Sequence, residues 1–242
     1  MYHDVVENGD EAASGLPGRG AALYKLDRQD FARHLQAIHD AVGQREVCLT
    51  FDDGGVSAHS TVAEMLERYG WHGYFFITTD WIGRPGFLNQ EQIRELERRG
   101  HIIGSHSCSH PTRMARVSWG QMVREWNESV LRLVEIVGHR VDLASVPGGY
   151  YSRKVALAAA QAGIQTLFTS EPTARVQFVE GCRVVGRYVV QRGMGPEWSA
   201  GFAAGGIVPR LRQAALWKAK RVAKVLGGEL YLHFRESILK KV

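Results

Sequence analysis

The chain lacks the features of a disulfide-stabilised or membrane-spanning protein. Its 242 residues include only three cysteines, Cys48, Cys108 and Cys182, whose wide separation gives neither a disulfide framework nor zinc-ribbon spacing. We expect reduced thiols, with Cys48 in the core of its strand. No apolar run approaches the roughly 20 residues that a membrane-spanning helix needs. Internal repeats and low-complexity tracts are also missing.

The first residues do not form the apolar stretch of a signal peptide, because charged side chains interrupt it. We therefore expect a cytoplasmic protein, with an exported form left open. A hydrophobic content of 45% in 242 residues allows a substantial core and falls in the size range of single α/β barrels. Residues 1–242 are accordingly expected to form one domain.

Strand and helix patterns alternate along the chain, which favours βα units around a parallel sheet. The expected strands are 46–51, 73–78, 101–105, 141–146, 165–169 and 182–190, and the expected helices are 30–42, 58–69, 89–99, 118–137, 152–162 and 208–226. Phe31, Leu35, Ile38 and Val42 lie on one stripe of the first helix, so His34 is expected to face solvent. A glycine-rich stretch, 193–206, precedes the last helix.

Two adjacent carboxylates end an apolar strand, where residues 50–54 read Thr-Phe-Asp-Asp-Gly. Because strand side chains alternate faces, Asp52 and Asp53 point in different directions and can take separate roles, one binding a metal and the other a proton. The same three letters, Asp-Asp-Gly, are also common in ordinary turns. A second motif is therefore needed to distinguish a site from a turn.

A pair of histidines provides that motif, since residues 106–110 read His-Ser-Cys-Ser-His after another apolar strand. Histidines at i and i+4 face the same way on a helical turn, so His106 and His110 can reach one ion while an aspartate supplies a third ligand. Three protein ligands leave one coordination position open. Cys108 is expected to be a small filler between the two histidines.

Together these motifs resemble those of the polysaccharide deacetylases, the NodB-homology group of family 4 carbohydrate esterases. Residues 74–77, Tyr-Phe-Phe-Ile, are similar to a third family segment, and the resemblance covers roughly residues 46 to 170. It implies an α/β fold, a single distorted barrel of the (β/α)7 type with parallel strands. It also implies that Asp53, His106 and His110 bind a divalent metal, with Asp52 as general base. Zn²⁺ is the expected ion, and Co²⁺, Ni²⁺ or Mn²⁺ are alternatives.

The resemblance implies a hydrolase that removes N-acetyl groups from an N-acetylglucosamine-containing polysaccharide or glycan. Residues 145–150, Ser-Val-Pro-Gly-Gly-Tyr, lack the arginine that tethers the base in many members, and Arg187 is a candidate substitute. The family's position after the proline corresponds to Gly148, whose N–H is expected to face the oxyanion, while Tyr150 is expected to contact substrate. Further aromatic candidates for sugar stacking are Trp81, Tyr151 and Trp198.

The general acid has two candidate positions. Residues 1–6, Met-Tyr-His-Asp-Val-Val, are similar to the opening of the poly-N-acetylglucosamine deacetylases, a branch whose circularly permuted barrel places the acid before the Asp-Asp motif. This similarity assigns the acid to His3, with Asp4 as its orienting partner. The usual late motif would instead use His233, which lies in a helical pattern.

Positive charge is concentrated at the end of the chain. Residues 209–242 contain nine Lys or Arg and two Glu, a net +7, whereas the whole chain carries +5. We expect a basic helical extension over about 208–242, with an apolar stripe docked on the barrel and a solvated basic face. The alternative is peripheral contact with anionic lipid or an acidic polymer. No recognition motif predicts a nucleic-acid partner. The stripe comprises Leu211, Ala215, Ala219, Val222 and Leu226.

Two other functional classes stay open at this stage. A carbohydrate-binding scaffold of the same fold could keep the metal and catalyse weakly, since the tethering arginine is missing from its usual motif. Two histidines and one carboxylate also suit non-haem iron oxygenases. Those enzymes normally take their ligands from a β-sandwich barrel, which this pattern does not predict.

Overall fold

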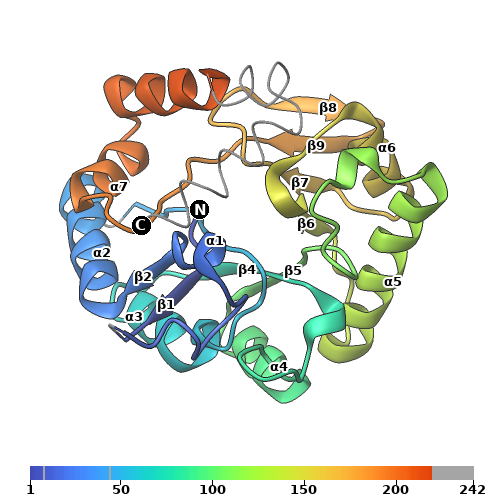
Figure 1. Ribbon diagram of the computed structural model, residues 1–242, viewed down its shortest axis with the longest axis horizontal. Coiled ribbons are helices and arrows are strands. Elements are labelled where there is room, and N and C mark those ends of the chain that lie inside the picture. Colours follow the sequence, from blue (N-terminus) through green and yellow to red (C-terminus); the bar gives the residue numbers. More distant parts are fainter. Residues whose placement is uncertain (8, 44, 220–242) are drawn as a thin grey trace.

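The computed structural model describes residues 1–7, 9–43 and 45–219 (Figure 1). Its centre is a curled seven-stranded sheet with the order β3-β4-β5-β6-β7-β9-β8. All neighbouring strands are parallel except β8, which runs antiparallel to β9. The strands are β3 Leu49–Phe51, β4 Gly73–Ile77, β5 Ile102–Ser105, β6 Leu143–Ser145, β7 Thr166–Phe168, β8 Gln177–Val179 and β9 Cys182–Val185.

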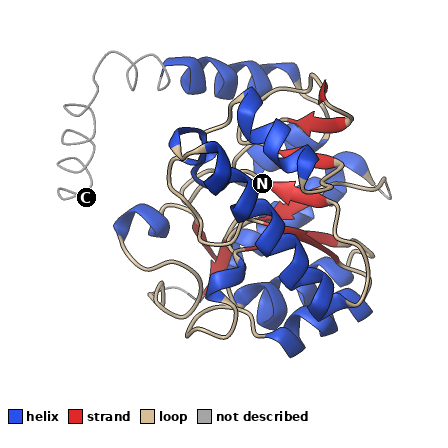
Figure 2. Cartoon of the chain, turned by 90° about the vertical axis from the view of Figure 1, so that its right-hand side faces the viewer, coloured by secondary structure: helices blue, strands red, loops and turns tan. Residues whose placement is uncertain are grey.

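Helices cover the outside of this sheet (Figures 1 and 2). They are α1 Arg19–Ala22, α2 Arg28–Val42, the π-helix Ala58–Val62 continued by α3 Ala63–Glu67, α4 Gln90–Arg98, α5 Trp119–Val137, α6 Arg153–Gln161 and α7 Pro196–Ala203. Ser118 caps α5 by accepting from the Gln121 N–H, as its spacing predicts. Ser152 precedes α6 without a side-chain cap bond. No described helix is long and apolar enough to cross a membrane.

The opening residues complete the curl of the sheet. Tyr2 pairs in parallel with Phe51 of β3, donating to Thr50 O at 2.8 Å. On its other side, Met1 O accepts from the Val190 N–H at 2.9 Å, beyond the end of β9. These bonds connect β3 to the chain that follows β9, so the predicted distorted barrel is confirmed. Strand β1 (Asp4–Val6) then pairs with β2 (Lys25–Asp27) in a separate parallel sheet.

Two hydrophobic clusters form the core. One lies around β3, β4 and the helices α2 to α4, and the other lies around β6, β7, β9 and α6. Helix α5 contributes to both, because Trp126 packs in one and Leu133 in the other. The predicted apolar stripe of α2 is fully buried, as expected for an amphipathic helix against a sheet.

Several sequence expectations are wrong. His34 is buried rather than solvent-facing, because its ring accepts and donates bonds inside the protein. Cys48 is exposed, since it lies just before β3 begins. The strands β2 and β8 are too short to leave a pattern in the sequence. Helix α7 forms within the glycine-rich stretch, where Pro196 occupies its first turn.

The last described helix, residues 207–219, faces the barrel with a different side from the predicted one. Leu211 is 65% exposed instead of docked on the barrel. Gln213 contacts the barrel instead, because its side chain bonds both the N–H and the C=O of Val189. Ala215 and Ala219 of the predicted stripe are also exposed, and Val222 and Leu226 lie outside the described residues.

Candidate active site

Three side chains with metal-binding chemistry meet at the carboxyl ends of β3 and β5. Asp53 Oδ1 lies 3.3 Å from His106 Nε2 and 3.4 Å from His110 Nε2. One potential ligand atom from each residue lies within 4.8 Å of the others. Two atoms bound tetrahedrally about 2.1 Å from one ion lie about 3.4 Å apart, which matches both aspartate–histidine distances. The donor set therefore fits a divalent ion.

The histidines are carried by an irregular loop, so the predicted helical turn is wrong. Ser107 and His110 have positive φ values of 66° and 58°, which a right-handed helix does not allow. Glu125 of α5 holds the loop: its carboxylate accepts from the N–H groups of Cys108 and Ser109 and from the Ser109 hydroxyl. The two rings converge because of this loop geometry.

A backbone carbonyl fixes the ring of His106. Its Nδ1 lies 3.0 Å from Ser145 O and donates to it, so in the neutral ring Nε2 carries the lone pair that faces Asp53. Burial opposes a charge on His106, but the carboxylates of Asp52 and Asp53 outweigh it and raise its pKa. Burial and the neighbouring His106 lower the pKa of His110 to about 4. The ring of His110 is thus neutral at physiological pH.

Asp52 is bound by the arginine that the sequence singled out as a substitute tether. Arg187 Nη1 donates to Oδ1 at 2.7 Å and Nη2 to Oδ2 at 2.8 Å. Burial alone would raise the pKa of Asp52, but Arg187 first and His106 second hold it well below its usual range. Asp52 therefore stays ionised, and its two oxygens have a fixed direction.

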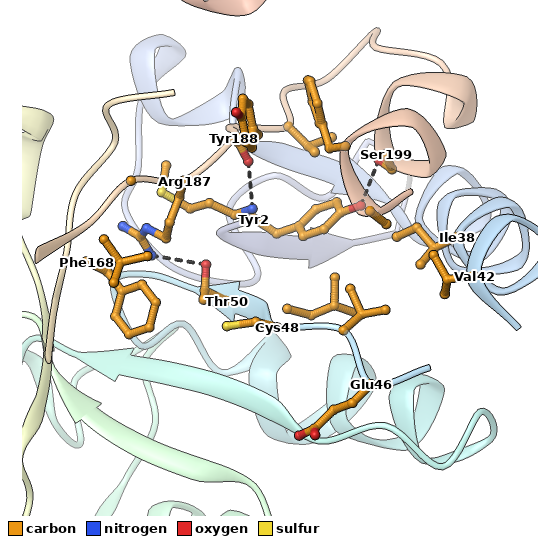
Figure 3. Close-up of a pocket in the computed structure, with 18 of the residues that line it drawn as sticks. Tyr2, Ile38, Val42, Glu46, Cys48, Thr50, Phe168, Arg187, Tyr188 and Ser199 are labelled. Atoms are coloured by element: carbon orange, nitrogen blue, oxygen red, sulfur yellow. Dashed lines mark hydrogen bonds between the residues drawn. The ribbon is translucent and has the colours of Figure 1, made fainter. Parts of the chain in front are cut away.

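Arg187 is itself held by neighbours from several strands. It donates to Thr50 Oγ1 at 3.1 Å, to Ser145 Oγ at 2.6 Å and to Thr169 O at 3.2 Å. Its guanidinium also lies 5.5 Å from the ring centre of Phe76. Arg187 and Thr50 also line a cavity of about 330 Å³ (Figure 3). Asp53, His106 and His110 are not among the described residues that line this cavity.

His3 lies close enough to the cluster for its charge to act on Asp52, Asp53 and His110. Its ring stacks at a tilt on Tyr24, with 4.5 Å between ring centres. Nδ1 of His3 is buried without a hydrogen-bond partner among the described residues. His233, the alternative acid, lies outside them.

The neighbouring Asp4 does not orient His3. Its carboxylate accepts instead from the hydroxyls of Ser14 at 2.6 Å and Ser57 at 2.9 Å. Tyr2 anchors this segment from the other side, because its hydroxyl donates to Ser199 at 2.9 Å (Figure 3). The predicted orienting role of Asp4 is therefore wrong.

The residues after β6 form a tight turn over Pro147–Gly149. Gly148 has φ of 62°, and a Cβ there would lie 2.4 Å from Thr112 O. Only glycine fits this position without a shift of the backbone. The next aromatic residue, Tyr150, is half-buried.

Aromatic side chains differ in their relation to the cluster. Trp81 lies beside it, with 5.1 Å between its ring centre and that of His110, and Phe87 packs on Trp81 at 5.0 Å. Trp198 packs away from it, against Phe202 and under Arg212. Sequence reasoning missed Phe87 and Glu125, because neither belongs to a motif and both act through tertiary contacts.

The site lies on a mostly parallel sheet, whereas a non-haem iron oxygenase is expected to carry its ligands on a β-sandwich. Comparison with known sequences points elsewhere: the family model of polysaccharide deacetylase matches residues 39–167, more than half of the chain. YxkH of Bacillus subtilis, a polysaccharide deacetylase homologue, is 24% identical over 169 residues, which cover 62% of this chain and 60% of YxkH. The peptidoglycan-N-acetylmuramic acid deacetylase PdaA of the same species is 28% identical, covering 52% of this chain and 47% of PdaA.

Solved structures share the fold. The deacetylase PplD of Streptococcus pyogenes, in complex with acetate, has a TM-score of 0.67 at 19% identity, covering 81% of this chain and 93% of PplD. IcaB of Ammonifex degensii has a TM-score of 0.63 at 20% identity, covering 84% of this chain and 96% of IcaB. With the family match and the site residues at the strand ends, these likenesses confirm the expectation drawn from the motifs: the chain belongs to the polysaccharide deacetylase family.

Proposed function

We propose that this protein is a metal-dependent N-deacetylase acting on an N-acetylglucosamine-containing polysaccharide or glycan. The observation that carries the proposal is the pairing of two adjacent carboxylates with different partners. Asp53 faces the Nε2 atoms of His106 and His110, whereas Asp52 is bound by Arg187. This difference in partners supports metal binding by Asp53 and proton acceptance by Asp52.

Asp53, His106 and His110 would hold the divalent ion, which we propose to be Zn²⁺ on the basis of two imidazoles and one carboxylate. When bound, the ion polarises a carbonyl and lowers the pKa of water. The hydrogen bond from His106 to Ser145 O fixes the tautomer that this role requires. Glu125 fixes the loop that carries both histidines.

Asp52 is the proposed general base. Its ion pair with Arg187 keeps it charged and aims its oxygens, while lowering its basicity. The hydroxyl of Ser145 donates to Oδ2 at 3.1 Å and further restricts its rotation. Arg187 therefore acts on the reaction by positioning Asp52.

The remaining roles belong to His3, Gly148 and the aromatic residues beside the cluster. Protonated His3 would donate to the departing amine, for which its unpartnered Nδ1 and its place beside Asp52 and Asp53 are the support. The Gly148 N–H, in the turn that follows β6, would donate to the oxyanion. Trp81 and Phe87 would stack on a sugar ring, with Tyr150 as a further contact.

Mass spectrometry of N-acetylglucosamine oligomers incubated with zinc-loaded protein tests this proposal. We expect loss of acetyl groups and release of acetate. The matched control is Asp53→Asn, which should stay folded and leave the oligomers intact. If the wild-type protein binds zinc and sugar but leaves every acetyl group in place, the weakly catalytic scaffold is the correct function instead.

A further inference from the structure

The helix formed by residues 207–219 exposes apolar side chains to solvent. Ile207 is 73% exposed, Val208 75%, Leu211 65% and Leu216 54%. Ala215, also exposed, lies between Leu211 and Val208 around the helix axis, and Leu216 lies farther round on the solvent-facing half. We call these five residues the apolar face. Figure 2 shows the helix at the edge of the molecule.

Polar side chains attach the same helix to the barrel. Gln213 donates to Val189 O at 2.8 Å and accepts from its N–H at 3.0 Å. Arg210 donates to Phe202 O at 2.8 Å and lies 5.2 Å from the ring centre of Tyr188. These contacts fix the rotation of the helix, so the apolar face cannot turn inward without breaking them.

An ordinary surface helix buries its large apolar side chains, whereas this helix exposes four of them. Large exposed aliphatic residues are unremarkable when scattered, but a contiguous group marks a surface that binds something. We therefore expect the apolar face to bind a partner outside the barrel.

The basic residues near the apolar face indicate the charge of the partner that binds it. Arg212 and Lys218 are exposed on the helix that carries the apolar face. Residues 209–242 together carry nine Lys or Arg and two Glu, a net charge of +7. A second copy of this chain would bring two such stretches together and repel. An anionic surface would attract them.

We propose that the apolar face of helix 207–219 binds the surface of an anionic lipid bilayer. A helix with exposed aliphatic residues and neighbouring basic side chains lies in the plane of the interface, with its apolar side below the headgroups. The lysines and arginines add attraction to anionic lipids, and this attraction weakens as salt screens it. Unlike the deacetylation proposed above, this inference does not depend on the metal site.

Co-sedimentation of the full chain with lipid vesicles tests the inference. We expect binding to phosphatidylglycerol-containing vesicles, weaker binding to phosphatidylcholine alone, and a decrease with added salt. The double variant Ile207→Gln, Leu211→Gln keeps every charge and should bind at least tenfold more weakly. The matched control is Phe178→Gln, which removes a side chain that is 69% exposed on β8 and should leave binding unchanged.

Circular dichroism and zinc content establish that both variants remain folded. Lack of binding by the wild-type chain would overturn the inference, as would equal binding to both vesicle types. An equal loss of binding in Phe178→Gln would also overturn it, because the effect would then not be specific to the apolar face. A wild-type dimer that the double variant abolishes, without vesicle binding, would identify a second copy as the occupant.

Discussion

Arg187 binds Asp52 through two parallel hydrogen bonds, although the two residues are 135 positions apart in the sequence. Nη1 lies 2.7 Å from Oδ1 and Nη2 lies 2.8 Å from Oδ2, with both side chains almost completely buried. Arg187 thus takes the place of the arginine that residues 145–150 of this chain lack. It also holds the pKa of Asp52 well below its usual range.

Replacing Arg187 by Ala should destabilise the protein by about 3–5 kcal/mol at neutral pH, because Asp52 is left buried without a counter-charge. The lowered pKa of Asp52 in the native protein means that its contribution to stability is present above the unfolded pKa and is lost as the pH falls through the folded pKa. Without Arg187 burial raises that pKa, so the defect should shrink as the pH falls below the raised pKa of the variant.

Urea unfolding at several pH values measures this effect. Arg183→Ala, on the same strand β9 with an exposed side chain, is the matched control and should change stability little. A similar loss in both variants, or a defect that does not vary with pH, would contradict the ion-pair explanation.

Asp52→Asn and Asp53→Asn should separate the two carboxylates. The first should keep bound zinc and lose turnover by about 10²–10⁴, the usual contribution of general acid–base catalysis. The second should lose most of the metal, because Asp53 faces both histidines at 3.3 and 3.4 Å. Atomic emission after dialysis, together with an acetate assay, checks both. Equal metal loss in the two variants would refute the division of roles.

His3→Ala should lower turnover by roughly 10²–10⁴ without lowering metal content, if its ring is the general acid. His233→Ala should be nearly silent. The comparison uses the same acetate assay on both variants, with zinc content as the measure of an intact site. The opposite pair of results would assign the acid to the late motif and leave His3 a structural residue.

Glu125→Ala should weaken zinc binding by about 10- to 100-fold, as expected when a group that orients ligands is removed. The cause is the loss of its bonds to the Cys108 and Ser109 N–H groups, which fix the loop between the histidines. Glu135→Gln, exposed on the same helix, serves as the control. Unchanged zinc affinity in Glu125→Ala would show that the loop holds its shape without this carboxylate.

Zinc affinity should rise with pH around neutrality. The raised pKa of His106 means that this ring keeps its proton to higher pH, and the metal must displace it. His110, with a pKa of about 4, contributes no proton in that range. Calorimetry in buffers of different ionisation enthalpy should detect protons released on zinc binding, and fewer of them as the pH rises. Asp52→Asn should weaken the pH dependence, and an affinity that stays flat in the native protein would contradict the assignment.

Short sequence motifs were sufficient to predict the cluster of Asp53, His106 and His110. Asp53 and His106 follow apolar strands directly, and parallel strands bring their carboxyl ends to one edge of the sheet. The cap of α5 at Ser118 was likewise predictable, because it depends on residues three positions apart.

Only the tertiary structure decided which distant groups meet. The sequence offered Arg187 as a candidate, but the closure of the sheet placed it against Asp52. The amphipathic pattern of α2 assigned His34 to solvent, whereas packing of α7 against α2 buried it beside Ser199. For helix 207–219, the polar contacts of Gln213 set the rotation that apolar periodicity predicted wrongly. Periodicity records which face of an element is apolar, and tertiary packing determines what that face meets.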